Sequence, residues 1–204
     1  MDPNNKDKTP GWEFVLFADT VKAGLASMED AYQAHRAGQT DLGGNVGDQS
    51  ADDVRARADQ LTAWVERTGL LLTEEIVTAA FGAPGEPGNE SVIRLFAQSY
   101  VSIYAGILAW ARNTRCVQAE PEWRPVYTAL AAMADDPLRE FHEFADDFAQ
   151  RAHTIADDLG AGRPASVQMT LTLRITISDD ATKAFDVALK NLAPPPRRGL
   201  FSRR

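Results

Sequence analysis

The sequence predicts a mainly α-helical protein, a bundle of five to six helices with a C-terminal β-strand–helix appendage. Through most of the chain, apolar residues recur at alternating steps of three and four, which is the spacing of amphipathic helices. Hydrophobic residues make up 44% of the 204 residues and charged residues 25%, which is typical of a chain with a packed core. Only residues 167–177 change the period, because apolar and polar side chains alternate there one by one, as in a β-strand.

The first two helices have clear start signals. Thr9 and Pro10 suit the N-cap and the first position of a helix that ends at Gly38. Its apolar stripe consists of Phe14, Ala18, Val21, Leu25, Met28 and Tyr32. After a Gly-rich loop, Ser50 and Asp53 form the pattern of a capping box for the second helix. The expected buried face of that helix is Val54, Ala58, Leu61 and Val65.

The third helix, about residues 91–113, is the most apolar segment of the chain. A helix that is apolar nearly all round is either the centre of a bundle or a membrane span. Its polar residues Arg94, Gln98 and Ser102 lie at steps of four on one narrow stripe. Such polar groups are costly in lipid, so we expect the central helix of a bundle and no membrane span.

Arg94 and Gln98 are the candidate residues for a ligand site or a structural ion pair. A buried arginine needs a partner, because an uncompensated interior charge is strongly destabilising. Glu74 or Glu75 of the preceding helical segment is one expected partner, and an anionic ligand is another. Since Arg94 lies near the helix start, its side chain also has a route to solvent.

Two further helices are expected before the strand. The fourth follows Pro121 or Pro125 and ends near Ala134. The fifth starts at Asp136, with Pro137 at the first helical position, and ends at Gly160. Its apolar stripe keeps the spacing of three and four over three heptads, at Leu138, Phe141, Ala145, Phe148, Ala152, Ile155 and Leu159.

The strand is the strongest indication of how the protein interacts. Its apolar residues, the candidate pairing residues, are Val167, Met169, Leu171, Leu173, Ile175 and Ile177. A strand needs a neighbour to satisfy its backbone amides and carbonyls. That neighbour is the same strand of a second copy, the sheet edge of another protein, or an unrecognised strand of this chain. The frequency of two-fold symmetric dimers favours the first, so we expect a homodimer.

A last helix follows the strand, capped by Ser178 or Asp179. Residues 173–192 resemble the first half of a ribbon–helix–helix DNA-binding protein. The resemblance rests on the polar face formed by Thr172, Arg174 and Thr176, on an Ile-x-Ile pair and on the Ser-Asp cap. It implies paired strands that enter the major groove. The chain ends before a second helix, however, and its main part is acidic.

Charge and cysteine content restrict the partners. The net charge is −8, and the tail 193–204 carries four arginines and no acid, so the rest of the chain carries −12. An acidic surface repels phosphate, and nucleic acid is therefore an unlikely partner. The polar first residues lack the apolar core of a signal peptide, and the single cysteine, Cys116, gives no reason to expect an oxidising compartment. We expect a cytoplasmic protein.

Catalytic and cofactor motifs are weak. His142 and His153 are about 16 Å apart along one predicted helix and do not share a metal ion. The Gly-rich stretches 38–49 and 82–88 follow no strand and match no phosphate-binding pattern. We expect no metal and no cofactor, and an enzyme is the less favoured class.

These observations predict a non-enzymatic interaction or scaffold protein of bacterial origin, homodimeric through the strand, with a basic tail that suits a protein partner. One alternative is a small-molecule-binding helical domain, with a pocket between the helix of Trp110 and the helix of Phe141 and Phe148. The other is a DNA-binding regulator with a ribbon–helix-like C-terminus. The expected organisation is a disordered N-terminus at 1–8, a bundle at 9–162, a dimerising strand–helix appendage at 163–192 and a basic tail at 193–204.

Overall fold

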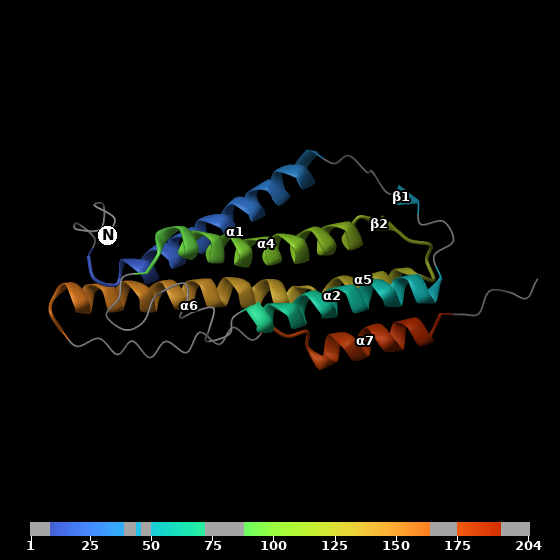
Figure 1. Ribbon diagram of the computed structural model, residues 1–204. Coiled ribbons are helices and arrows are strands. Elements are labelled where there is room, and N and C mark those ends of the chain that lie inside the picture. Colours follow the sequence, from blue (N-terminus) through green and yellow to red (C-terminus); the bar gives the residue numbers. More distant parts are fainter. Residues whose placement is uncertain (1–8, 39–43, 46–49, 72–87, 164–174, 193–204) are drawn as a thin grey trace, which may run out of the picture.

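The computed structural model describes residues 9–38, 44–45, 50–71, 88–163 and 175–192, and these residues form a mainly helical bundle (Figure 1). The predicted fold class is therefore confirmed. The helices are α1 (Trp12–Gly38), α2 (Ala51–Leu71), α4 (Glu90–Arg115), α5 (Arg124–Ala132), α6 (Asp135–Gly160) and α7 (Asp179–Lys190).

Helix α4 is the centre of the bundle and packs against α1, α2, α5 and α6. Helix α1 runs parallel to α4, because Phe17 lies beside Phe96 and Gly24 lies beside Val101. In Figure 1, α1 lies close to α4 near its N-terminus and diverges from it towards its C-terminus. The prediction of a central third helix is thus confirmed within the described residues.

Aromatic side chains fill the space between α1, α4 and α6. The ring of Phe17 lies 5.2 Å from that of Phe96 and 5.1 Å from that of Phe148. Tyr100 meets Phe141 edge-on, with ring centroids 4.6 Å apart. Aromatic pairs at such distances add about 0.5–1.5 kcal/mol each to the energy of burial. They occupy the region near Phe141 and Phe148 where the small-molecule alternative expected part of its pocket.

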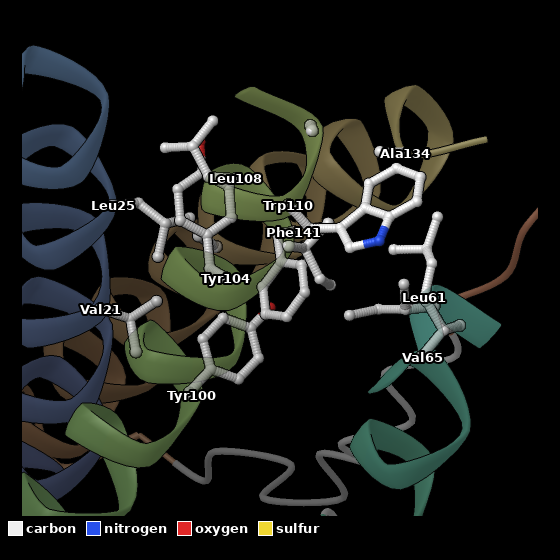
Figure 2. Packing of buried hydrophobic residues seen from close by; sticks show 14 of the residues in the cluster. Val21, Leu25, Leu61, Val65, Tyr100, Tyr104, Leu108, Trp110, Ala134 and Phe141 are labelled. Carbon is white, nitrogen blue, oxygen red and sulfur yellow. The ribbon is translucent and has the colours of Figure 1, made fainter. Parts of the chain in front are cut away.

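The second half of the core joins α4 to α2. Figure 2 shows Val21 and Leu25 of α1 on one side of α4, and Trp110 pointing from α4 towards Leu61 and Val65 of α2. The indole of Trp110 donates a hydrogen bond to the backbone carbonyl of Arg57, at 3.2 Å. The predicted buried face of the second helix is confirmed, since Val54, Ala58, Leu61 and Val65 are all buried.

Two details of α1 differ from the prediction. The helix starts at Trp12 and not at Pro10, because Gly11 has a φ of +84°, which no helical residue adopts. Phe17 is fully buried although the predicted stripe omitted it. Helix α1 packs against both α4 and α6, so its buried arc is wider than a single stripe.

The start of α6 also differs from the prediction. The helix begins at Asp135, and neither Asp136 nor another side chain caps it. Met133 and Ala134 keep right-handed helical dihedrals between α5 and α6, so the two helices lie nearly end to end (Figure 1). Asp136 instead accepts a hydrogen bond from Arg139 at 2.7 Å. The predicted apolar stripe is confirmed, because Phe141, Ala145, Phe148, Ala152 and Ile155 are buried.

A two-residue parallel ladder pairs β1 (Gly44–Asn45) with β2 (Val117–Gln118). The sequence does not reveal this contact, because two residues are too few to show a period of two. The capping box at the start of α2 is confirmed. The Ser50 amide donates to the Asp53 carboxylate at 3.0 Å, and the Asp53 amide donates to the Ser50 hydroxyl at 3.2 Å. The Ser50 amide and then the Ser50 hydroxyl, which both donate to the Asp53 carboxylate, lower the pKa of Asp53.

Gly24 gives a direct test of the packing of α1 on α4. A Cβ atom at this position would lie 2.5 Å from Cγ2 of Val101, closer than real contacts allow. We therefore expect Gly24→Ala to lower the free energy of unfolding by about 1–3 kcal/mol through overpacking. The control is Gly160→Ala, whose Cβ would make an ordinary 3.5 Å contact with Thr9. Urea unfolding of the two variants checks this, and equal stabilities would contradict the close approach of α1 and α4.

Candidate interaction surface

The described part of the predicted strand is its end, Ile175 to Ile177. Over these three residues the structure has no sheet pairing. Ile175 is buried in the core and Ile177 packs against it. Val167, Met169, Leu171 and Leu173 lie outside the described residues, so the pairing of the strand with a second copy stays a prediction.

Side chains of α6 hold this segment. The carboxylate of Glu140 accepts hydrogen bonds from the Thr176 amide, at 2.7 Å, and from the Thr176 hydroxyl, at 3.1 Å. Asp136 has a lowered pKa because of hydrogen bonds with Arg139 and then with Ser178. Ser178 in turn caps α7 by accepting from the Ala181 amide. Thr176, which the ribbon–helix–helix resemblance places on the DNA-facing side, thus bonds to this protein's own α6.

Arg94 and Gln98 lie on the exposed side of α4. Arg94 forms an ion pair with Glu90, four residues earlier, at 3.1 Å. Glu74 and Glu75, the expected partners, lie outside the described residues. The pair is half-exposed and joins neighbouring turns of one helix, so it is worth at most a few tenths of a kcal/mol.

The exposed side of α4 carries apolar residues beside the polar stripe. Leu95 is 64% exposed and Val92 is 37% exposed. Along one side of the helix, four exposed side chains and the partly buried Ala105 are separated by three, four, three and four residues. We call them the outer face of α4: Leu95, Gln98, Ser102, Ala105 and Ala109. No residue of this face carries a charge.

The inner side of the same helix supplies much of the core. Its buried residues are Ile93, Phe96, Ala97, Tyr100, Tyr104, Ile107, Leu108, Trp110, Ala111 and Thr114. Even so, only 39% of the most apolar stretch of Glu90–Arg115 is buried. By length and composition alone this helix is apolar enough to cross a membrane, which is weak evidence for a single helix. A helix that is apolar nearly all round is usually buried, whereas Leu95 and Ser102 of this helix are exposed.

One polar cluster joins three helices near the middle of α4. The Tyr104 hydroxyl donates to Glu29 of α1 at 3.2 Å and contacts Nε2 of His142 of α6 at 2.8 Å. A phenol has one proton to donate, so when the Tyr104 hydroxyl donates to Glu29, Nε2–H of His142 donates to the Tyr104 oxygen. Burial, and then the charge of Glu29, raise the pKa of Tyr104. The cluster orients three helices and keeps the phenol neutral.

Among the described residues, no three His, Cys, Asp or Glu side chains meet in a group that suits a metal ion. Three buried polar atoms have no hydrogen-bond partner among the described residues: the Tyr100 hydroxyl, the Tyr127 hydroxyl and Nη1 of Arg57. Burial also raises the pKa of Tyr100 and of Tyr127.

The sequence pattern contained a signal for the outer face that the prediction did not use. Arg94, Gln98 and Ser102 were interpreted as polar positions of a buried helix, and the structure places all three towards solvent. The residues between them include Leu95 and small residues in a repeat of three and four.

No protein-family model, curated protein or solved structure matches this chain significantly.

The Glu140 contact predicts a local effect. Glu140→Gln removes the charge that strengthens two hydrogen bonds to Thr176, so we expect a loss of about 1 kcal/mol in local stability. Hydrogen exchange should show faster exchange of the Thr176 amide and of the start of α7. Glu143→Gln, on the same helix but paired with Arg139, should leave these amides unchanged. Equal exchange in both variants would contradict the role of Glu140.

The buried tyrosines predict the response to alkaline pH. A tyrosine whose pKa is higher in the folded state than in the unfolded state keeps its full contribution to stability below about pH 10, its unfolded-state pKa. Above this pH the unfolded state ionises first, so the contribution is lost as the pH rises further. For Tyr100, which is almost fully buried, the loss is about 1.4 kcal/mol per pH unit. Tyr100→Phe should keep or increase stability at neutral pH, because the lost hydroxyl is unpaired, and should reduce the alkaline loss.

Urea unfolding at neutral and alkaline pH measures both effects. Tyr32→Phe is the matched control, because the side chain of Tyr32 is partly exposed. An alkaline slope in Tyr100→Phe as steep as in the unaltered protein would show that the Tyr100 phenol is not held neutral by the fold.

Proposed function

We propose that this chain is a non-enzymatic interaction protein that associates with a second copy of itself, in keeping with a bacterial cytoplasmic scaffold protein. The observation that carries this proposal is the uncharged, partly apolar outer face of α4, with Leu95 64% exposed. Large exposed apolar side chains that lie beside one another are typical of surfaces that become covered on binding.

The energetics favour covering this face. Removing apolar surface from water contributes about 25 cal/mol per Å². Polar groups along the face are uncharged, so their desolvation costs far less than that of ionised groups. Elsewhere, the described surface of the bundle carries many ion pairs, such as Lys22–Asp146 and Arg151–Asp147, which bind water well. Covering the outer face of α4 therefore costs less desolvation than covering surface with such ion pairs.

A membrane partner fits the contacts of α4 less well. The inner side of the helix packs against four other helices, and its Tyr104 bonds to Glu29 and His142. Insertion of α4 in lipid would separate these groups, and each unsatisfied polar group costs several kcal/mol in hydrocarbon. The bundle contacts favour a protein partner over a lipid one.

The predicted strand offers a second surface for the same self-association. A strand with the apolar residues Val167 to Leu173 would need a partner strand for its backbone groups, and α6 holds the described end of the segment at Thr176. Pairing with a second copy remains the proposal that the sequence favours for this segment.

Light scattering after gel filtration tests the proposed function. We expect the purified chain to reach twice its own mass as the concentration rises, because one surface on each copy is covered. Leu171→Pro removes one amide from the strand, and a loss of mass in this variant would assign part of the interface to the strand. A chain that stays monomeric up to its solubility limit would contradict self-association.

A further inference from the structure

The outer face of α4 has the geometry of a helix-pairing seam. Leu95, Gln98, Ser102, Ala105 and Ala109 follow one another at steps of three, four, three and four. This is the spacing of the contact positions in a two-helix coiled coil. The seam runs over about 21 Å of helix, at ~1.5 Å per residue. Every position of the seam is uncharged, so a second helix can cover it without burying an ion.

The seam positions are nearly symmetric about Ser102, and the residues before Ser102 are larger than those after it. Counting outward from Ser102, Leu95 and Ala109 are each seven residues away, and Gln98 and Ala105 differ from it by four and three residues. In an antiparallel pair centred on Ser102, Leu95 of one copy therefore lies opposite Ala109 of the other. Gln98 lies opposite Gly106 and next to Ala105. Each large residue meets small ones, which lets the two helices approach closely.

The surroundings of Gly106 agree with a close approach. A Cβ atom at this position would have no heavy atom within 4 Å, so the space outside the helix is open there. Val92 and Ser99 occupy the same row as Gly106, seven residues apart, and both are exposed. The row therefore widens the seam on one side, with its largest residue again at the N-terminal end of the helix.

A parallel pair would fit less well. Leu95 would then lie against Leu95 of the second copy, and Ala109 against Ala109, so that the pair would be wide at one end and leave a gap at the other. Such a gap loses the contacts that make helix packing favourable. Residue size decreases along the face from Leu95 to Ala109. The outer face of α4 therefore fits a second α4 that runs in the opposite direction better than one that runs in the same direction.

The charges at the ends of α4 point to the same orientation. The first turn carries Glu90, and the last turn carries Arg112 and Arg115. An antiparallel pair brings Glu90 of one helix near the basic last turn of the other, and it also opposes the two helix dipoles. Glu90 and Arg115 already pair with Arg94 and Asp135 of their own chain. The charges therefore select the orientation more than they strengthen the association.

We infer that the outer face of α4 binds the same face of a second copy of this chain, in antiparallel orientation, with Ser102 at the two-fold axis. This inference rests on the proposed self-association and adds the surface, the orientation and the register. A single helix pair buries less surface than a standard interface of about 1,200–2,000 Å², so the dimer is weak and depends on concentration. The negative charge of the two bodies opposes it, and added salt should strengthen it.

Single cysteines test the register. All variants carry Cys116→Ser, because Cys116 is exposed. Ser102→Cys should form a disulfide-linked dimer under mild oxidation, because residues at the axis lie within the ~7 Å between Cα atoms that a disulfide needs. Leu95→Cys alone should not, since its two copies would be about 21 Å apart, fourteen residues along the seam. A mixture of Leu95→Cys and Ala109→Cys should give the mixed dimer.

The control for random collision is Val187→Cys on α7, which replaces a side chain 56% exposed and away from α4. Its cross-linking should match the background. A Leu95→Cys homodimer formed as fast as the Ser102→Cys dimer would indicate a parallel pair and overturn the inference. Absence of the Ser102→Cys dimer at concentrations where light scattering shows a dimer would also overturn it, while the proposed self-association would stand. A strict monomer would remove both.

A charge in the seam gives an independent measurement. Leu95→Glu places two carboxylates in the dimer, and we expect the dimer dissociation constant to rise at least tenfold. Because Leu95 is exposed in the single chain, circular dichroism and urea unfolding should be unchanged. Val187→Glu is the matched control and should dimerise as the unaltered chain does. An unchanged dissociation constant for Leu95→Glu, or flotation of the monomer with phospholipid vesicles in place of dimerisation, would overturn the inference.

Discussion

The packing of aromatic rings from α1 and α6 on the inner side of α4 is the interaction on which the rest of the bundle depends. Phe17, Phe96, Tyr100, Phe141 and Phe148 meet there with ring centroids 4.6–6.4 Å apart. These contacts place α1 parallel and α6 antiparallel to α4. Gly24 and Gly11 are required by the same packing, because each lets another helix approach where a Cβ atom would collide or crowd.

Since α4 uses one side for this packing, its other side remains outside the described core. The chain combines an apolar composition around the whole helix with burial on the inner side alone. That difference is the physical basis of the proposed self-association. Residue size on the exposed side decreases from Leu95 to Ala109. The large end of one copy therefore fits the small end of a second copy when the two helices are antiparallel.

Polar contacts in this protein position elements more than they create a reactive centre. Glu140 and Asp136 hold the segment before α7, and Tyr104 joins α1 to α6 through Glu29 and His142. Each contact uses a side chain that sequence periodicity alone places on a polar surface. Their partners come from segments 36 to 75 residues away in the chain, as with Thr176 and Glu29.

The sequence by itself determined the helical class, the order of the helices and most of their buried faces, because local periodicity and capping residues are sufficient for these. The Ser50–Asp53 capping box and the α6 stripe are examples. It did not locate the start of α1 or the uncapped start of α6, which depend on the backbone of Gly11 and on the continuation of α5. The β1–β2 ladder was missed because it is too short for a pattern.

Only the tertiary structure decided which side of α4 faces the core and which faces solvent. Its sequence is apolar in most directions, and the polar stripe Arg94, Gln98 and Ser102 suits both a solvent-facing side and a polar contact inside a bundle. The contacts of α1, α2, α5 and α6 make that choice, and they leave Leu95 and Ser102 outward. The sequence left open whether Arg94 is buried with a partner or reaches solvent, and the structure shows it half-exposed and paired with Glu90 of the same helix.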